Sequence, residues 1–354
     1  YTEYGVETSI NFPNFLFPFI SSDFKRKIRA TTEFGLQYNY QLRPEFLRTM
    51  ASANWSYKWT QRQKIQHRIA FLYLPRISDR FKEDYINKGQ NHIFQYNYQD
   101  RLIINMGYSY NYNSVGGSII NNTIASNSYS IRFNFESAGN VMYALSKAAN
   151  IRKNSNGEYA ILGIPYAQYL KGEFDFAKNI RIDYRNSFAF HAGVGIAVPY
   201  GNAKTIPFEK QYFSGGANSV RGWSVRDLGP GSFAGNGNLL DQSGDIKLDA
   251  SIEYRSKLFW KFQGAVFIDA GNIWTIRSYA NQPGGVFKFD RFYKQIAVAY
   301  GLGLRLDLDF FILRFDGGMK AVNPAYETRK EHFPIIHPKF SRDFAFHFAV
   351  GYPF

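Results

Sequence analysis

Residues 295–309 read Gln295-Ile296-Ala297-Val298-Ala299-Tyr300-Gly301-Leu302-Gly303-Leu304-Arg305-Leu306-Asp307-Leu308-Asp309. Large apolar side chains occupy almost every even position, and small or polar ones occupy the odd positions. Because successive side chains of a strand point to opposite faces, this period of two predicts a β-strand with one apolar and one polar face. The stretch is also long enough for a tilted strand to cross a bilayer, which takes about 9–11 residues.

The same alternation recurs along the whole chain, from residues 4–12 to the closing segment Phe344–Phe354, and we count thirteen such segments. A soluble sandwich also alternates. The length of the segments and the Tyr, Trp and Phe near their ends instead favour an all-β transmembrane antiparallel β-barrel. Single-chain barrels normally hold an even number of strands. Either the first strands therefore lie upstream of Tyr1, or a strand has been overlooked, for which residues 91–99 are the best candidate.

The composition agrees with a membrane barrel. The 354 residues include no cysteine and 18% aromatic side chains, yet the mean hydropathy is only −0.34, because apolar and polar residues are interleaved. No run approaches the ~20 apolar residues of a spanning helix. The formal charge of +14 comes from scattered Lys and Arg, which argues against nucleic acid as a partner and favours an anionic lipid surface.

The connections between the predicted strands alternate between long and short after residue 138. Membrane barrels have short periplasmic turns and longer outer loops, so the connection 199–244 should start on the outer side. Residues 13–28 and 113–126 are longer than an inner turn should be, and the pattern offers no reason for either.

The connection 199–244 contains a glycine-rich stretch, Phe213–Trp223, with a single arginine, Arg221. A buried arginine needs a carboxylate partner. Asp269 and Glu253 both lie on the polar parity of their strands, which would face the lumen. They are either ordinary lumen residues or the acceptors of Arg221, and composition alone leaves both interpretations open.

Catalytic chemistry has little support in the sequence. The six histidines show no metal-ligand spacing, and the glycines at 215, 216 and 222 lack the Lys-Ser/Thr of a phosphate loop. No Gly-x-Ser-x-Gly elbow occurs, so nothing supports a lipase-bearing barrel. We therefore expect no catalytic residues, no metal and no cofactor, and a protein that is not an enzyme.

Val220-Arg221-Gly222-Trp223 resembles the Val-Arg-Gly-Phe/Tyr loop motif of the BamA/TamA superfamily of outer-membrane insertases, with Trp223 in the aromatic slot. Glu253-Tyr254-Arg255, Asp269-Ala270-Gly271 and the aromatic closing segment resemble the strands that follow this motif in the family. Phe12–Phe19 is similar to a segment of the TamL-like Bacteroidota branch. The match with specific motifs covers about the last 160 residues.

The resemblance implies a sixteen-stranded barrel preceded by periplasmic POTRA domains, with the motif loop folded into the lumen. The loop arginine would pair with acidic residues that match Asp269 and, in part, Glu253. Residues 1–354 would then be the barrel domain, with the first few strands and the POTRA domains upstream of Tyr1.

The expected function is assembly, insertion or translocation of proteins at the bacterial outer membrane by lateral opening of the barrel. A seam beside the last strand would offer unpaired backbone groups to a client strand. The residues assigned to this seam strand are Phe344, Phe346, Phe348, Gly351 and Phe354. A two-partner-type secretion pore and a passive porin or uptake barrel are the alternatives, although a loop that plugs the lumen argues against free diffusion. Expected partners are the lipid bilayer and lipopolysaccharide, unfolded outer-membrane clients, and accessory periplasmic or lipoprotein subunits.

Overall fold

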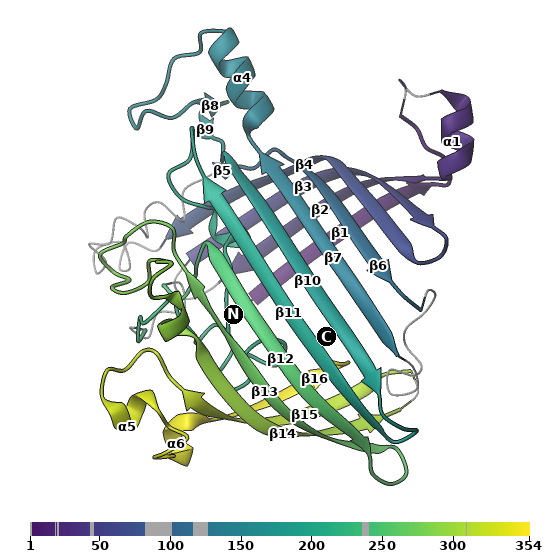
Figure 1. Cartoon of the computed structure of the whole chain (residues 1–354). Helices are drawn as coiled ribbons and strands as arrows, with labels where there is room; N and C mark the ends of the chain where they lie inside the picture. Colours follow the sequence, from purple (N-terminus) through teal and green to yellow (C-terminus); the bar gives the residue numbers. More distant parts are fainter. Residues whose placement is uncertain are drawn as a thin grey trace. The chain divides into compact units, whose positions relative to one another are not determined.

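A computed structural model describes residues 2–17, 19, 21–42, 46–81, 101–115, 127–235, 241–308 and 310–354. Strands dominate the fold (Figure 1). The strands are β1 (Thr2–Phe12), β2 (Thr31–Leu42), β3 (Phe46–Gln61), β4 (Ile65–Phe81), β5 (Arg101–Leu102), β6 (Asn105–Asn113), β7 (Ser128–Ala138), β8 (Ala160–Ile161), β9 (Ile164–Pro165), β10 (Tyr169–Arg181), β11 (Asn186–Pro199), β12 (Ile246–Lys257), β13 (Phe262–Trp274), β14 (Ala297–Asp307), β15 (Ile312–Val322) and β16 (Phe344–Val350).

The helices are short and lie in the connections. They are α1 (Ser22–Ile28), α4 (Asn140–Ala148), α5 (Arg329–His332) and α6 (Phe340–Asp343), with single turns η2 (Phe208–Lys210) and η3 (Phe292–Gln295). Within the described part of the chain, none of the helices has the length and apolar character needed to cross a membrane.

The long strands follow one another in the sheet in the order β1-β2-β3-β4-β6-β7-β10-β11-β12-β13-β14-β15-β16. The neighbours within β1–β4 and within β11–β16 are antiparallel. These strands match the thirteen predicted from the period of two, so that prediction is confirmed for the described residues. The segment 91–99 lies outside them. β5 adds to β4, and β8 pairs with β9 in a small sheet of its own.

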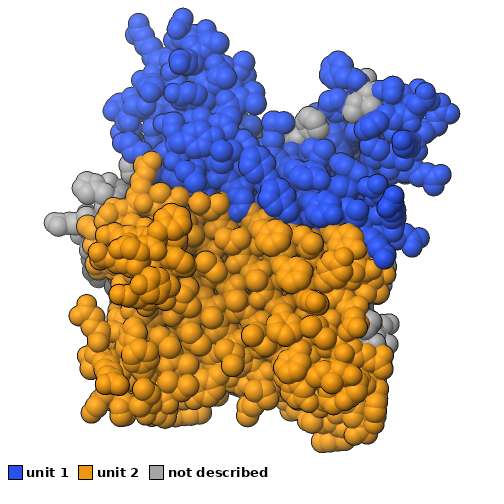
Figure 2. All heavy atoms as spheres, viewed as in Figure 1, with its two compact units in different colours: residues 1–111, 133–172, 197–210 blue, residues 112–132, 173–196, 211–354 orange. Residues whose placement is uncertain are grey.

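The chain divides into two compact units (Figure 2). Unit 1 comprises Tyr1–Asn111, Phe133–Gly172 and Ala197–Lys210, and unit 2 comprises Tyr112–Arg132, Glu173–Ile196 and Gln211–Phe354. Strands β12–β16 and the stretch Phe213–Trp223 therefore belong to the same unit.

The strands of unit 2 have an exposed apolar face and a buried inner face. Leu302 on β14 is 67% exposed, while its neighbours on the opposite parity are small residues that turn inward. An exposed apolar face suits contact with lipid. The alternation places six large apolar residues on one parity of β14 and β16, and all lie on this face: Val298, Tyr300, Leu302, Leu304, Phe346 and Phe348.

The connections of unit 2 lie as predicted. The β12–β13 and β14–β15 hairpins are short, whereas the connections before β12, after β13 and after β15 are long and lie at the other end of these strands. In unit 1, the connection between β1 and β2 contains α1 and lies at the same end as the tight β3–β4 hairpin. Most of residues 113–126 fall outside the described part of the chain.

The last strand is shorter than the sequence predicts. The alternation of the closing segment predicts a strand over Phe344–Phe354, but β16 ends at Val350. Gly351 adopts a φ of 88°, a left-handed conformation that favours glycine and turns the chain out of the strand. Pro353 then offers no backbone donor to a ladder. As a result, Tyr352 and Phe354 lie over the guanidinium of Arg255, with their ring centroids 4.4 and 5.3 Å from it.

Candidate functional site

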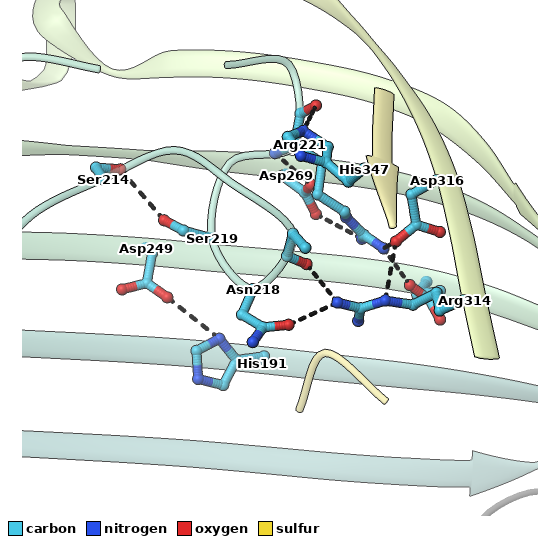
Figure 3. A network of polar contacts seen from close by, with 12 residues as sticks. His191, Ser214, Asn218, Ser219, Arg221, Asp249, Asp269, Arg314, Asp316 and His347 are labelled. Carbon is cyan, nitrogen blue, oxygen red and sulfur yellow. Dashed lines mark hydrogen bonds and ion pairs between the residues drawn. The ribbon is translucent and has the colours of Figure 1, made fainter. Parts of the chain in front are cut away.

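The segment Gly215–Trp223 forms a tight turn that presents Arg221 on the inner face of unit 2 (Figure 3). The Gly216 amide donates to the Trp223 carbonyl at 2.9 Å, and the Trp223 amide donates to the Val220 carbonyl at 3.3 Å. Gly215 and Gly216 have φ values of 93° and 99°. Because residues other than glycine rarely adopt these angles, the glycine pair sets the direction of the turn.

Apolar packing holds this turn against β14. Val220 and Trp223 are buried in one cluster with Leu228, Ala297 and Ala299. A Cβ at Gly222 would lie 2.8 Å from the Ala299 Cβ, so the loop backbone rests directly on the strand. The close approach of the loop to β14 therefore leaves no room for a side chain at position 222.

Arg221 is the polar centre of the site and is almost fully buried. Its Nε and Nη2 donate to the two carboxylate oxygens of Asp269, each at 2.8 Å, which is the bidentate pairing that guanidinium geometry favours. Its Nη1 donates to Glu253 Oε2 at 2.6 Å and lies 3.4 Å from Asp316 Oδ2. The guanidinium also stacks 3.5 Å from the ring centroid of Phe267.

These contacts fix the charge of Arg221. Burial disfavours the charged guanidinium, but the hydrogen bonds of Asp269 and the negative charges of Asp269, Glu253 and Asp316 outweigh burial and raise the pKa of Arg221 above its usual value. The arginine therefore carries its charge at any physiological pH, and its contribution is electrostatic anchoring.

Three further arginines surround these carboxylates. Arg255 Nε donates to Glu253 Oε1 at 2.7 Å, and Arg305 Nη2 donates to the same oxygen at 2.9 Å. Arg305 also lies 3.3 Å from Asp316 Oδ1, and Arg314 lies 3.2 Å from Asp316 Oδ2. Glu253 and Asp316 are each shared among the loop Arg221, Arg305 of β14 and an arginine of their own strand. Asp269 of β13 is bound by Arg221 alone among these arginines. Together the contacts link β12, β13, β14 and β15 through side chains and the loop.

Arg314 holds the tip of the turn from the strand side. Its Nη2 donates to the carbonyl of Ala217 at 2.9 Å and to the side-chain oxygen of Asn218 at 2.6 Å. The loop is therefore anchored in both directions, because Arg221 reaches from the loop to the strands and Arg314 reaches from β15 to the loop.

His347 connects the last strand to the same loop. Its Nε2 lies 2.9 Å from the Arg221 carbonyl oxygen, which can only accept, so Nε2 carries the proton in this contact. His347 is buried and stands opposite Asp316 in the β15–β16 register. The backbone of the loop thus contacts β16, and its guanidinium contacts β12, β13 and β15.

The structure brings together Val220, Arg221, Gly222 and Trp223 with Asp269 and Glu253. Of the seam residues, only Phe354 reaches this site, where its ring centroid lies 5.3 Å from the Arg255 guanidinium. Phe346 and Phe348 lie on the exposed face of β16, and Phe344 stacks on Phe340 of α6 at 4.2 Å between ring centroids. Phe354 lies beyond the strand and stacks on His191 of β11 at 5.2 Å.

Sequence reasoning missed Asp316, Arg305, Arg314 and His347. All four sit at inward positions of strands that were identified, so their parity could have drawn attention to them. Among the described residues, no group of three or more His, Cys, Asp or Glu is placed to hold a metal ion. The arrangement can position the loop against β12, β13 and β15 by paired charges, against β14 by apolar packing and against β16 by a hydrogen bond.

Known proteins give this arrangement a context. The Omp85 superfamily domain matches residues 2–354. Over 95 residues, or 24% of this chain, the sequence is 35% identical to the outer membrane protein assembly factor BamA of Neisseria meningitidis serogroup B, of which the match covers 11%. The fold is similar to that of BamA from Haemophilus ducreyi lacking POTRA domains 1-3, with a TM-score of 0.63 and 15% identity over 99% of this chain and 62% of that one.

A match to CdiB from Escherichia coli has a TM-score of 0.47 and 12% identity, and covers 83% of this chain and 47% of that one. The chain therefore spans less than two thirds of the length of each of these proteins. Because the superfamily domain matches all but the first residue, the chain belongs to the Omp85 superfamily, and it is an integral β-barrel protein of the outer membrane.

Proposed function

We propose that this barrel inserts client polypeptides into the outer membrane, or translocates them across it, by opening laterally beside β16. Membership of the Omp85 superfamily supports a role in insertion or secretion. Two features of unit 2 support lateral opening beside β16.

The observation that carries the proposal is the position of the Arg221 loop. Its guanidinium is bound to acids on β12, β13 and β15, and its backbone contacts His347 on β16. A passive pore needs no such brace. A barrel that opens at one seam needs the strands beside the seam to stay in register while the seam strand moves, and the shared charges supply that rigidity.

The edge of β16 is the second feature. On one side it pairs with β15 from Leu313↔Val350 to Met319↔Phe344. Among the described strands, β15 is its only neighbour. An edge of this kind presents backbone donors and acceptors to which an incoming strand can pair, and within lipid every backbone group must find such a partner.

The proposed partners follow from this route. They are unfolded outer-membrane proteins as clients, the surrounding bilayer with its lipopolysaccharide, and accessory periplasmic or lipoprotein subunits that deliver clients. Covalent catalysis is not part of the proposal, because ion pairs and hydrogen bonds account for the chemistry of the site.

A disulfide lock tests the lateral route. Cysteine would replace Ala349 on β16 and a facing residue on the first strand of the complete protein, reconstituted in vesicles. A urea-unfolded client barrel would be added, and its folding followed by its heat-dependent mobility in gels. We expect the oxidised protein to lose client folding and the reduced protein to regain it.

The matched control places a disulfide between strands that stay paired. Phe315 and Phe348 face each other across β15 and β16, with ring centroids 5.3 Å apart. The pair Phe315→Cys and Phe348→Cys should fold clients equally well when oxidised and when reduced. Full activity of the seam-locked protein would overturn lateral opening and leave transport through the lumen.

A further inference from the structure

The connection between β1 and β2 folds back over the sheet of unit 1. The Leu16 amide donates to the Thr32 hydroxyl at 3.0 Å, and this hydroxyl donates to the Asn14 carbonyl at 2.7 Å. Phe15 packs edge-on against Tyr57 of β3, with ring centroids 4.6 Å apart. Thr32 and Tyr57 are both fully buried as a result. The connection is thus held on the strands by specific contacts.

The face that it covers is the apolar one. Thr32 shares its parity on β2 with a row of exposed apolar residues, Phe34, Leu36 and Tyr38, whereas the opposite parity carries Glu33 and Gln37. In a membrane barrel the exposed apolar face is the lipid-facing one. Residues 13–17 therefore lie on the side of the sheet that faces lipid.

The rest of the connection exposes large apolar side chains. Phe19 is 88% exposed, Phe24 is 46% exposed and Leu16 is 45% exposed. Phe19 continues an aromatic row, since its ring centroid lies 5.8 Å from that of Phe17, which packs on Tyr57 at 6.1 Å. Aromatic side chains at this density are typical of the zone where a bilayer meets water.

Helix α1 adds a concentrated positive charge. Residues 22–29 contain Lys25, Arg26, Lys27 and Arg29 against one carboxylate, Asp23, so three positive charges are left uncompensated. The helix is fixed at both ends: the Ser21 hydroxyl accepts from the Phe24 amide at 3.4 Å, and Arg29 ends the helix with a φ of 52°. These cations follow the aromatic row directly in the chain.

We propose that residues 13–17, 19 and 21–29 form an interfacial anchor that binds anionic phospholipid headgroups. Phe19 and Phe24 insert at the boundary of the bilayer, and the cations of α1 pair with lipid phosphates. The connection lies at the same end of the strands as the tight β3–β4 hairpin, and short turns mark the periplasmic side. The anchor therefore takes lipids of the periplasmic leaflet.

A single fluorescent probe tests the anchor in the folded protein. The chain has no cysteine, so Phe19→Cys can carry one environment-sensitive label. The labelled protein would be reconstituted in phosphatidylcholine vesicles with and without phosphatidylglycerol. We expect blue-shifted emission, quenching by lipids that carry a quencher near the headgroup, and protection from iodide. All three effects should be stronger when phosphatidylglycerol is present and weaker at high salt.

Reversing the charges of α1 distinguishes electrostatic binding of anionic lipid from apolar contact with the bilayer. Each cation near an anionic surface contributes about fivefold in binding. The triple variant Lys25→Glu, Arg26→Glu, Lys27→Glu should therefore lower the docked-to-free ratio at Phe19 by about a hundredfold or more. The matched control reverses three exposed cations in and after α4, with Lys147→Glu, Arg152→Glu and Lys153→Glu, and should leave the probe unchanged.

With vesicles alone, either of two results would overturn the anchor. One is a probe at Phe19 that stays open to iodide in both vesicle types. The other is equal protection with and without phosphatidylglycerol that the triple variant does not change. Protection that appears only when a periplasmic protein is added would also overturn it, and would assign this surface to a protein partner. Heat-dependent gel mobility of each variant verifies that the barrel has folded.

Discussion

At Arg221, one guanidinium is shared among three buried carboxylates, so its removal leaves negative charges without compensation. Breaking a buried ion pair by removing one member typically costs ~3–5 kcal/mol. We expect Arg221→Ala to lower the free energy of unfolding by about this amount, and Arg221→Lys to restore only part of it, because the fork that binds Asp269 at two points is lost.

Denaturant titration of the protein in lipid measures this loss, and protease cleavage within 213–235 reports whether the loop is released. Arg291→Ala is the matched control, because Arg291 is exposed and pairs with its neighbour Asp290 at 3.2 Å. An exposed pair of this kind contributes about 0–1 kcal/mol. Equal losses for the two variants would contradict the anchoring role of Arg221.

Gly318 tests the close contact between the loop and β15. A Cβ at this position would overlap the Arg221 carbonyl oxygen, whereas a Cβ at Gly264 would meet Leu258 at an ordinary 3.5 Å. Gly318→Ala should therefore displace the loop and destabilise the protein by about 1–3 kcal/mol, while Gly264→Ala should change stability little. The unfolding midpoints of the two variants measure this difference. Similar midpoints would show that the loop does not rest on β15.

Asp245 makes stability depend on pH at the loop end of β12. Burial raises the pKa of its carboxyl from 3.8 to about 6, although a hydrogen bond from the Ile276 amide and the charge of Arg277 favour the ionised form. The folded state therefore binds more protons than the unfolded state between these pH values, so stability falls as pH rises through this window. Burial, together with the charge of Asp245, raises the pKa of the nearby Tyr279 to about 12.

The expected fall in stability is up to about 3 kcal/mol between pH 4 and pH 7. Asp245→Asn, which keeps the neutral form at every pH, should flatten this part of the profile. Melting temperatures of both proteins across the range measure the effect. A profile for Asp245→Asn that parallels the parent would place the titration elsewhere.

The pairing of Arg221 with Asp269 and Glu253 could be anticipated from a motif and from strand parity. The contacts of Asp316 and His347 could not, because they join residues 95 and 126 positions away from Arg221. The period of two gives the face of a residue but not the register of its strand. A register shift between β14 and β15 at Val298 and Ala299 also changes which residues face each other across these two strands, and the alternation does not reveal it.

Among the elements, the strands were predictable and the helices were not. A strand that faces lipid on one side must alternate over its whole length, which leaves a strong signal. In the part of the chain that the structure describes, the helices in the connections are at most nine residues long, too short to show a helical period. The end of β16 was predicted wrongly because the alternation continues through Tyr352, while the positive φ of Gly351 ends the strand earlier.

The two faces of a strand should tolerate charge differently. Arginine at Leu302, on the exposed face of β14, should cost ~2–4 kcal/mol near the bilayer midplane. Gly301 does not serve as the inward comparison, because a Cβ there would overlap Phe267. Ala177→Arg, at a partly exposed inward position of β10, is the better control and should cost much less. Folding yields in lipid compare the two, and equal tolerance would contradict the assignment of faces.

For the whole molecule, the order of the sheet follows the order of the chain, so the ends of the path are β1 and β16 among the described strands. A client that enters by strand pairing should meet β16 and no interior strand. A photocrosslinker at Phe346, which is 62% exposed, should therefore capture a client. The same group at Ile252 on β12, which is 48% exposed, should not.

Mass-shifted adducts of a labelled client during folding provide the readout. Adducts at both positions would mean that clients contact the barrel surface without regard to the seam. Adducts at neither position would indicate that clients pass without touching the exposed face of β16.

The Arg221 loop also has a consequence for biogenesis. Its partners appear along the chain one after another: Glu253 lies 32 residues beyond Arg221, Asp269 lies 48, Asp316 lies 95, and His347 lies 126. The loop therefore cannot be fully secured until the final strand has formed. The loop is fully bound only when strands β12 to β16 are all in place. A barrel that stalls before β16 therefore keeps a loose loop that proteases can reach.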